Sequence, residues 1–399
     1  MNQGNEGNGN GDIEQGVKLS YDASVDSVSW HSYLTGPNAP VNTLENWQVG
    51  GTDLGFPIYN SKNGKMYVAF GDTFLKAQTQ QGLWRSNVVG VTQDFDFSDG
   101  IAFDTFLGNG DLAQSIFEGI HQDKFEMTKI PTGGIEVNGV MYYFYFSKYS
   151  WNVDSRYSMN YGGAVKSKDE GKTWERVNDL SWLDNSMPDR KDEIEKLANQ
   201  NIFMQDGEKI ATMETHSGYS FTQIFPIDGK DGYVYILGEG GYRQGGIRLG
   251  RVAYADIEQF EKYEYFNGTD KDGEPIWLKG HAGLVEVEKN KSSYIVSDRC
   301  SEQSAMWNEY LKKWMVVYLQ DVGAGGGGIL YRVADNIYGP YSEPRTLVPY
   351  SFPFENDVHS IYAGIVHEKW TEQNGKVFYL VISQWMPVYN SSFMKIVLK

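Results

Sequence analysis

The chain has few residues that could crosslink it or bind metal. Of its 399 residues only one is cysteine, Cys300, so no disulfide can form within the chain. A single cysteine does not indicate a cellular compartment. The six histidines show no close paired spacing, so the sequence carries no metal-binding signature. No apolar run is long enough to form a membrane-spanning helix. The sequence therefore predicts neither a metal site nor a membrane-spanning segment.

Positive charge is also scarce. The chain has 35 basic and 52 acidic residues, a formal net charge of −17. Binding to a phosphate backbone needs clustered Lys and Arg, and docking on anionic lipid needs the same. We therefore expect no nucleic-acid partner. A neutral polymer, such as a polysaccharide, is the more natural partner.

Aromatic residues are abundant. They make up 15% of the chain, with 27 Tyr, 20 Phe and 11 Trp. Aromatic side chains suit the pleated faces of sheets. They also form flat platforms for sugar rings. The composition therefore favours β structure and permits carbohydrate binding.

The N-terminus reads as a tether. Residues 2–12 consist of Gly and Asn with a few acids and one Gln, and contain no apolar residue. We expect residues 1–16 to be a disordered segment left after removal of an export signal. A bacterial surface lipoprotein without its lipid-bearing cysteine would look like this, whereas the alternative is a cytoplasmic protein with a frayed end. A secreted, periplasmic or outer-surface location is expected, with 17–399 as one domain and the protein a monomer.

One strand pattern recurs five times. A turn residue precedes a run of β-branched and aromatic residues at 63–70, 138–145, 231–237, 312–319 and 374–382. Asn-Gly or Asp-Gly before such a run is typical of a tight hairpin. Further strands are expected after each hairpin, for example at 162–167 and 247–252. Five units of four strands predict an all-β fold, a five-bladed β-propeller. Short helical insertions are expected at 188–199 and around 112–120.

A local motif supports the propeller. Residues 167–174, Ser-Lys-Asp-Glu-Gly-Lys-Thr-Trp, match the Asp-box found on the blades of sialidases and related proteins. Asp169 can accept hydrogen bonds from backbone N–H groups of the turn, Gly171 allows a positive φ, and Trp174 can pack into the blade. Such boxes lie on the rim, so the motif indicates the fold and not the chemistry.

Two aspartates stand beside strand-like runs in the first unit. Asp53 lies in Gly-Gly-Thr-Asp-Leu-Gly and Asp72 in Gly-Asp-Thr-Phe. Strands disfavour Asp and Gly, so these residues serve either a turn or a site. The innermost strand of a propeller blade lines the central axis, and Asp53 would be on that strand. Glycoside hydrolysis usually needs two carboxyl groups, which makes Asp53 a candidate for one of them.

Glu302 is the candidate for the second carboxyl group. It occupies the place in the fourth unit that Asp53 has in the first, among small and apolar neighbours. Such surroundings raise the pKa of an acid. Glu214 and Glu239 are alternatives in the third unit. Each of these glutamates could equally be a solvated or ion-paired group.

Polar and aromatic groups that could hold a glycan follow the same units. The alternative role for their aromatic members is packing within a blade. The candidates are Trp84, Arg85, Asn87, His359, Tyr362, Trp385 and Tyr389. No cofactor is expected, although a lone histidine near the axis could hold a structural cation through water.

Several blocks resemble one bacterial family. The blocks are 51–55 (Gly-Thr-Asp-Leu-Gly), 70–74 (Phe-Gly-Asp-Thr-Phe), 84–87 (Trp-Arg-Ser-Asn), 301–304 (Ser-Glu-Gln-Ser), and 383–385 (Ser-Gln-Trp) followed by Tyr389-Asn390. They look like the signature of the family called domain of unknown function 4185. Some of its members are placed in glycoside hydrolase family 183, the endo-D-arabinanases. The resemblance implies a five-bladed propeller that cleaves α-linked D-arabinofuranose chains, as found in mycobacterial arabinogalactan and lipoarabinomannan.

These observations predict an endo-acting glycoside hydrolase. Asp53 would be the base or nucleophile, Glu302 the general acid, and Asp72 would tune their pKa values or bind sugar. Three alternatives remain: a sialidase-like hydrolase, a non-catalytic glycan-binding propeller, and a structural surface protein. The exact linkage and the stereochemical outcome stay open, because the outcome depends on the separation of the carboxyl groups.

Overall fold

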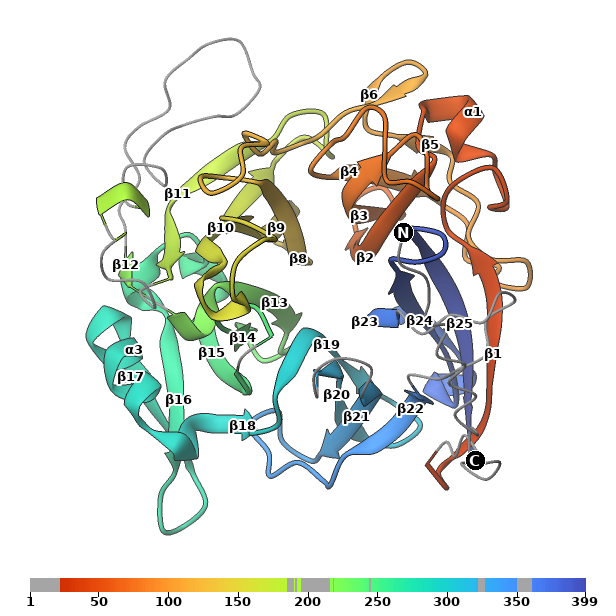
Figure 1. The fold of residues 1–399 in the computed structure, drawn as a ribbon. Helices are drawn as coiled ribbons and strands as arrows, with labels where there is room; N and C mark the ends of the chain where they lie inside the picture. Colours follow the sequence, from red (N-terminus) through yellow and green to blue (C-terminus); the bar gives the residue numbers. More distant parts are fainter. Residues whose placement is uncertain are drawn as a thin grey trace, which may run out of the picture.

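Five sheets stand around a central axis like the blades of a propeller (Figure 1). The computed structural model describes residues 22–184, 190, 192–194, 216–217, 219–243, 245–321, 327–349 and 361–399. In each blade four consecutive sheet neighbours pair antiparallel. The expected five-bladed β-propeller is confirmed.

The strands of each blade run from the axis outward. Blade 1 contains β2 (Gly51–Asn60), β3 (Lys65–Phe74), β4 (Val88–Thr92) and β5 (Thr105–Phe106). Blade 2 contains β8 (Thr128–Val137), β9 (Val140–Lys148), β10 (Met159–Ser167), β11 (Glu175–Leu183) and the parallel β12 (His216–Ser217). Blade 3 contains β13 (Gln223–Asp228), β14 (Tyr233–Glu239), β15 (Ile247–Ala253), β16 (Glu264–Thr269) and β17 (Pro275–Lys279), with β18 (Tyr294–Val296) beside β15. Blade 4 contains β19 (Cys300–Asn308), β20 (Lys313–Asp321), β21 (Gly327–Ala334) and β22 (Arg345–Pro349). Blade 5 contains β23 (Ile361–Glu372), β24 (Val377–Gln384), β25 (Asn390–Leu398) and β1 (Val25–Tyr33).

The five predicted hairpins are the inner strand pairs of the five blades. Two of them turn on consecutive residues with positive φ, at Asn138 (52°) with Gly139 (78°) and at Asn374 (60°) with Gly375 (92°). Both are Asn-Gly pairs, whose residues tolerate the left-handed region best, whereas at Asn63-Gly64 in the first hairpin only Gly64 has a positive φ (71°). The fourth hairpin has no Asn-Gly pair and uses Lys312, whose φ is 53°.

The ring is closed by the N-terminal strand. β1 pairs antiparallel with β25, in a register that runs from Val25 opposite Leu398 to Tyr33 opposite Ser392. The fourth strand of the last blade therefore comes from the start of the chain. The sequence pattern did not predict this, because it assigned each blade only to strands that follow its own hairpin.

Helices are few and lie outside the sheets. The described helices of more than one turn are α1 (Thr43–Trp47) and α3 (Gly280–Lys289). The helical piece expected around residues 112–120 is wrong, since β6 (Gly108–Asn109) and β7 (Leu112–Ala113) form a small hairpin and no helix follows. Of the helix expected at 188–199, most residues lie outside the described part of the chain.

The Asp-box forms the turn between β10 and β11. Asp169 Oδ1 accepts from the backbone N–H of Thr173 at 2.9 Å, and Ser167 Oγ accepts from the N–H of Gly171 at 2.8 Å. Gly171 has a φ of +85°, and the buried ring of Trp174 donates to its carbonyl oxygen at 3.1 Å. The structural role expected for this motif is confirmed.

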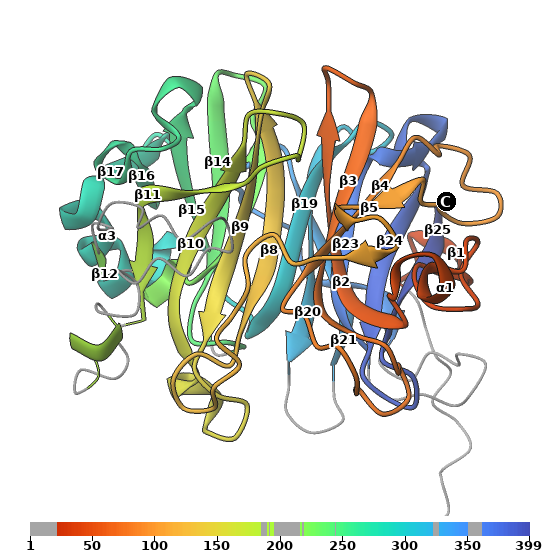
Figure 2. The same ribbon diagram turned by 90° about the horizontal axis from the view of Figure 1, so that it is seen from above.

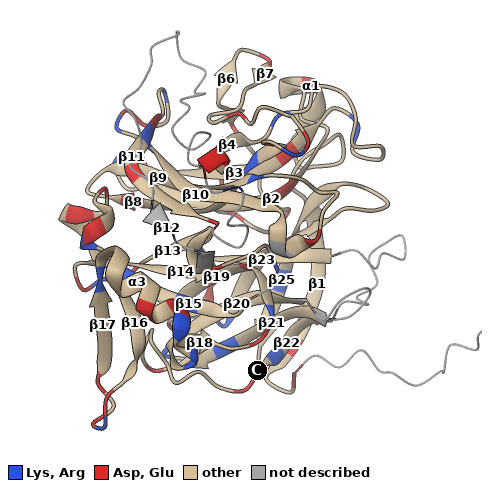
Figure 3. Cartoon of the chain, turned by 60° about the vertical axis from the view of Figure 1, so that its left-hand side comes forward, with Lys and Arg blue, Asp and Glu red and all other residues tan. Residues whose placement is uncertain are grey.

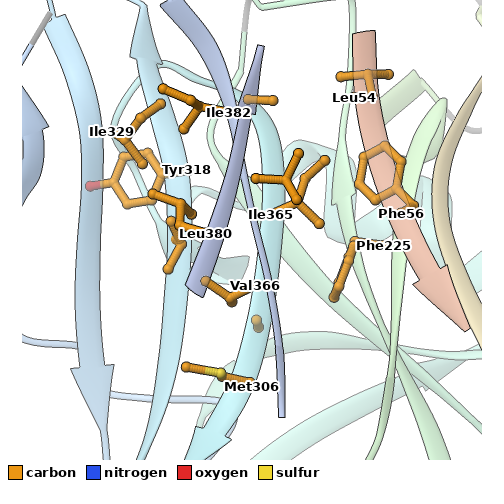
Figure 4. Packing of buried hydrophobic residues seen from close by; sticks show 14 of the residues in the cluster. Leu54, Phe56, Phe225, Met306, Tyr318, Ile329, Ile365, Val366, Leu380 and Ile382 are labelled. Atoms are coloured by element: carbon orange, nitrogen blue, oxygen red, sulfur yellow. The ribbon is translucent and has the colours of Figure 1, made fainter. Parts of the chain in front are cut away.

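Apolar side chains fill the middle of the central axis. The inner strands β2, β8, β19 and β23 lie near one another in the centre of Figure 2. Between them Leu54, Phe56, Phe225 and Ile365 approach each other (Figure 4), and the ring centroids of Phe56 and Phe225 are 6.1 Å apart. This apolar plug separates the two ends of the axis.

Candidate active site

A pocket lies on the axis where the five inner strands begin. Each inner strand contributes at least one lining side chain: Asp53 from β2, Thr132 from β8, Gln223 from β13, Glu302 from β19 and Tyr362 from β23. The pocket encloses about 470 Å³ of space including its open mouth. The fold thus brings Asp53 and Glu302, 249 positions apart in the sequence, to one pocket.

Bulges direct side chains of the inner strands at this level. The pairing register shifts between Thr52 and Leu54 in β2, and between Ser301 and Gln303 in β19. Each shift falls on a candidate carboxyl residue, Asp53 or Glu302. An extra residue in one strand locally breaks the regular alternation of side chains and re-aims one of them. The bulges therefore place both carboxyl groups on the pocket wall.

The bulge at Asp53 is held by the neighbouring blade. Leu54, with a φ of 59°, donates its N–H to Ser383 Oγ at 2.7 Å, and its carbonyl accepts from Ser391 Oγ at 2.6 Å. On the other side is Gly71, where an added Cβ would lie 2.3 Å from Asp53 Oδ1. Gly71 therefore has to be glycine for Asp53 to keep this position.

Asp53 is in a setting that favours its protonated form near neutral pH. Desolvation raises its pKa to about 7, and the negative charge of Glu302 acts in the same direction. Hydrogen bonds from the phenols of Tyr389 and Tyr362 oppose this rise in pKa, as does the charge of Arg243. The Tyr362 hydroxyl donates to Asp53 Oδ2 at 2.9 Å. Asp53 can therefore both give and take a proton close to pH 7.

Asp72 lies behind Asp53, near the end of β3. It is buried, and its Oδ1 accepts from Trp84 Nε1 at 2.8 Å and from Thr128 Oγ1 at 2.6 Å. Burial raises the pKa of Asp72 to about 8, and the charge of Asp53 adds to the rise. Asp72 is not among the residues lining the pocket. Asp72 can therefore affect a reaction in the pocket only through its electrostatic interaction with Asp53.

Glu302 has a different environment. Its Oε1 is 2.8 Å from Arg243 Nη2, and its Oε2 accepts from Ser301 Oγ at 2.6 Å. The Glu302 side chain is 9% exposed. A guanidinium in contact favours the charged form of a carboxyl group. Glu302 therefore has a cationic partner in direct contact.

The sequence reasoning missed a cationic and aromatic group at the same end of the axis. The buried Lys148 has its Nζ 3.3 Å from the ring centroid of Tyr242 and 4.3 Å from that of Trp151. Burial lowers the pKa of Lys148 well below its usual value, and the charge of Arg243 does the same. Both aromatic residues follow the second strand of a blade, as Trp84 does in blade 1. The equivalent positions of these aromatic residues after a second strand are the sequence feature that could have identified the group.

The predicted glycan-binding residues divide into two groups. Tyr362 lines the pocket, and Tyr389 is buried beside Asp53. Arg85 and Asn87 are instead part of the framework. Arg85 donates to the carbonyls of Ala113 at 2.8 Å and Gln48 at 2.6 Å. The side chain of Asn87 is fully buried and bonds the backbone on both its oxygen and its nitrogen. The structure does not bring these two side chains to the pocket.

The other candidates have separate positions. Trp84 is occupied as a donor to Asp72, and its ring centroid is 4.0 Å from that of His121. Trp385 is 49% exposed, directly after β24, at the end of the propeller where the pocket opens. His359 and Glu214 lie outside the described residues. Glu239 is buried and lines the pocket.

Metal ligands and membrane-spanning helices were not expected from the sequence. Within the described residues no cluster of three or more His, Cys, Asp or Glu side chains is placed to hold a metal ion. No helix in the described part of the chain has the length and apolar character needed to cross a membrane. Acidic and basic positions are interspersed along the strands and loops of the cartoon in Figure 3.

The fold and site together define a five-bladed β-propeller with three carboxyl groups, those of Asp53, Glu239 and Glu302, in an axial pocket. Acid–base chemistry on a glycosidic bond usually needs two carboxyl groups in different environments. The chain belongs to the family described as Domain of unknown function (DUF4185), whose profile matches residues 38–395. No curated protein matches the chain.

Several solved structures are similar to this chain at low sequence identity. A protein from Bacteroides ovatus ATCC 8483 is 12% identical, with a TM-score of 0.56 over 89% of this chain and 87% of that one. The GH43 protein BlXynB from Bacillus licheniformis is 12% identical, with a TM-score of 0.47 over 88% of this chain and 55% of that one. The α-L-arabinofuranosidase PaAbf62A from Podospora anserina is 13% identical, with a TM-score of 0.44 over 95% and 97%. The first of these supports the propeller architecture.

Proposed function

We propose that this propeller is a glycoside hydrolase that cleaves α-linked D-arabinofuranose polymers from within, at the axial pocket. The observation that carries the hydrolase proposal is the meeting of Asp53 and Glu302 in one pocket, Asp53 with its pKa raised by desolvation and Glu302 ion-paired with Arg243. The D-arabinan substrate and the endo mode follow from the family resemblance, since glycine-flanked Asp53 and Ser-Glu-Gln-Ser at 301–304 are parts of its signature.

The environments support a definite division of roles. Asp53, with a pKa of about 7, is suited to be the general acid that protonates the leaving oxygen. Glu302, paired with Arg243, is suited to be the base or nucleophile. This is the reverse of the assignment expected from the sequence. The buried Asp72 stays protonated, and therefore uncharged, below about pH 8, so it adds no negative charge near Asp53.

The pocket's charges favour a neutral substrate. The charge of Arg243 is paired with Glu302, and Arg85 is bonded to backbone carbonyls. Burial favours the neutral form of Lys148. A sialidase needs free guanidinium groups for the substrate carboxylate, so this arrangement supports a neutral glycan over sialic acid. Tyr362 and Trp151 on the pocket wall provide aromatic surface for sugar rings.

The first test is a product assay. Wild-type protein, Asp53→Asn and Glu302→Gln are incubated with mycobacterial arabinogalactan, with plant L-arabinan and a sialoside as control substrates. We expect a ladder of arabino-oligosaccharides from the wild type alone. Failure of the wild type to release product from any of the three, with glycan binding retained, would refute the enzyme and favour a glycan-binding propeller.

A second assay separates the two roles. An aryl arabino-oligosaccharide with a 4-nitrophenol leaving group needs little protonation as it departs. Asp53→Asn should therefore keep much more activity on this substrate than on the polymer, whereas Glu302→Gln should lose activity on both. The wild-type rate on the polymer should fall as the pH rises above about 7, where Asp53 ionises. The opposite pattern between the variants would restore Glu302 as the acid.

The cellular setting belongs to the same proposal. A polymer in a cell envelope is reached from outside the cytoplasm, so we place the protein at the cell surface or in the secreted fraction, as a monomer. A lipid anchor on the precursor would fit the glycine- and asparagine-rich segment at 2–12. Fractionation of the native host, with an antibody against the propeller, tests this location.

A further inference from the structure

A second pocket lies at the opposite end of the axis. Each inner strand begins at the candidate active site and ends here, so the same five strands line both pockets. The second pocket is wider, with about 1040 Å³ of space including its open mouth. The apolar plug of Phe56, Phe225 and their neighbours lies between the two (Figure 4). A ligand in one pocket therefore cannot reach the other through the axis.

The wall of the second pocket carries three half-buried aromatic side chains, Tyr59, Trp307 and Trp314. The two indole rings meet edge to face, with centroids 5.7 Å apart and planes at 71°. Trp307 Nε1 donates to Glu309 at 2.8 Å, which fixes the ring. Large rings that are rigidly held and partly exposed offer apolar faces to a ligand at little entropic cost.

Several charged groups around the second pocket have partners on its wall. Lys230 Nζ is 2.6 Å from Glu368 Oε2, and Lys369 Nζ lies 4.5 Å from the ring centroid of Tyr59. Glu136 accepts from Ser61 Oγ at 2.9 Å and from the backbone N–H of Gly139 at 3.0 Å.

Two further titratable groups complete the wall. Asp228 accepts from the N–H of Lys230 at 2.8 Å. Burial lowers the pKa of His367 to about 4, so its imidazole is neutral at ordinary pH. With three carboxylates and two ammonium groups at these positions, the pocket is not built for an anion. Carboxylate and ammonium groups that are already paired can still accept or donate hydrogen bonds, and the hydroxyl groups of an uncharged ligand can exchange such bonds with them.

We propose that this second pocket is a non-catalytic binding site for a neutral oligosaccharide segment, with Trp307 and Tyr59 as the ring platforms. Asp228 and Glu368 are exposed and Glu136 is held by Ser61 and Gly139, so no desolvated acid faces a ligand here and the pocket binds sugar without cleaving it. A chain held here would keep the enzyme on a polymer while the other pocket acts. The ligand class comes from this pocket's own residues, so the proposal does not require the axial pocket to be catalytic.

The test is a count of binding sites. Asp53→Asn protein, which should not consume the ligand, is titrated calorimetrically with neutral oligosaccharides of four to six sugar residues, from the arabino, xylo and cello series. We expect two sites per chain with at least one of these series. Adding Trp307→Ala should remove one site, while Trp307→Phe should keep it because a ring remains. Tyr310→Ala is the matched control, since Tyr310 is an exposed aromatic residue two positions beyond β19 and outside both pockets.

The outcomes separate this site from the proposed function. Binding that depends on Trp307 in a protein that cleaves nothing would support the second site and refute the hydrolase. The second site would be overturned if the titration shows one binding site per chain and that number is unchanged in Trp307→Ala and in Tyr59→Ala. Both variants must unfold thermally as the wild type does. A loss in Tyr310→Ala equal to that in Trp307→Ala would also overturn the second site.

Discussion

Replacing Asp72 with asparagine should make the protein more stable, and increasingly so as the pH rises. Asp72 is buried, and Oδ1 is the atom that accepts from Trp84 and Thr128. The amide oxygen of the asparagine side chain has the same shape and can accept both hydrogen bonds. The amide cannot ionise, however, so it removes the cost of keeping an acid protonated.

The size of the effect follows from the change in pKa. Burial raises the pKa of Asp72 from its ordinary 3.8 to about 8. Between these values the folded chain holds a proton that the unfolded chain has released, so wild-type stability falls by about 1.4 kcal/mol per pH unit. The penalty approaches about 4 kcal/mol at pH 7. Desolvation of the new amide N–H groups offsets about 1–3 kcal/mol, which leaves a net gain of about 1–3 kcal/mol at pH 7.

The assay is guanidinium chloride unfolding of wild type and Asp72→Asn at pH 5, 6, 7 and 8. The difference in the free energy of unfolding should grow with pH and be smallest at pH 5. Asp26→Asn, a change of an exposed acid on β1, should show no such trend. A variant that is less stable than wild type at pH 8, or a difference that does not depend on pH, would refute the reasoning. Below about pH 8 hydrolysis should change little in Asp72→Asn, since asparagine is uncharged as the protonated Asp72 is.

Four further changes test other parts of the structure. Arg243→Met should cost about 3 kcal/mol in denaturant unfolding by leaving Glu302 without its counter-charge, and adding Glu302→Gln should restore stability but not turnover. Gly71→Ala should lower turnover at least tenfold, because its Cβ would meet Asp53 Oδ1; an unchanged rate would contradict that contact. Trp174→Ala should cost about 3 kcal/mol with little effect on turnover, since the Asp-box is remote from the pocket; a large loss of turnover in folded protein would count against this. Deletion through Tyr33 should abolish cooperative thermal unfolding, because β25 loses its outer neighbour; a preserved transition would show that β1 is dispensable.

The repeated hairpins made most of the fold predictable. Turn chemistry is local, so Asn-Gly at 138–139 and at 374–375 identifies a hairpin without knowledge of the rest. Once the hairpins are ordered, the first strand of each is the innermost one, which places Asp53 and Glu302 at the axis. The pairing of β1 with β25 is the opposite case. It joins residues more than 350 positions apart, and no local pattern at 25–33 indicates which sheet it completes.

The site was predicted less completely because residue type does not fix the partner. Arg85 and Asn87 are types that bind sugars, yet the irregular loops around them leave carbonyls and N–H groups that need partners, and both side chains bond these. Arg243 reaches the site because the loop after β14 turns toward the axis, and Lys148, the last residue of β9, meets Tyr242 of that loop. The path of a loop depends on packing that the sequence alone does not display.

The two bulges differ in whether a glycine in the sequence marks them. At Asp53 the bulge involves positive φ at Leu54 (59°) and Gly55 (146°), so glycine appears in the sequence and marks the position. At Glu302 the register shifts between Ser301 and Gln303, and none of these three residues has a positive φ. A bulge of that kind needs no glycine. Glycine therefore indicated the first carboxyl group directly, whereas the second could be found only by its equivalent place in another blade.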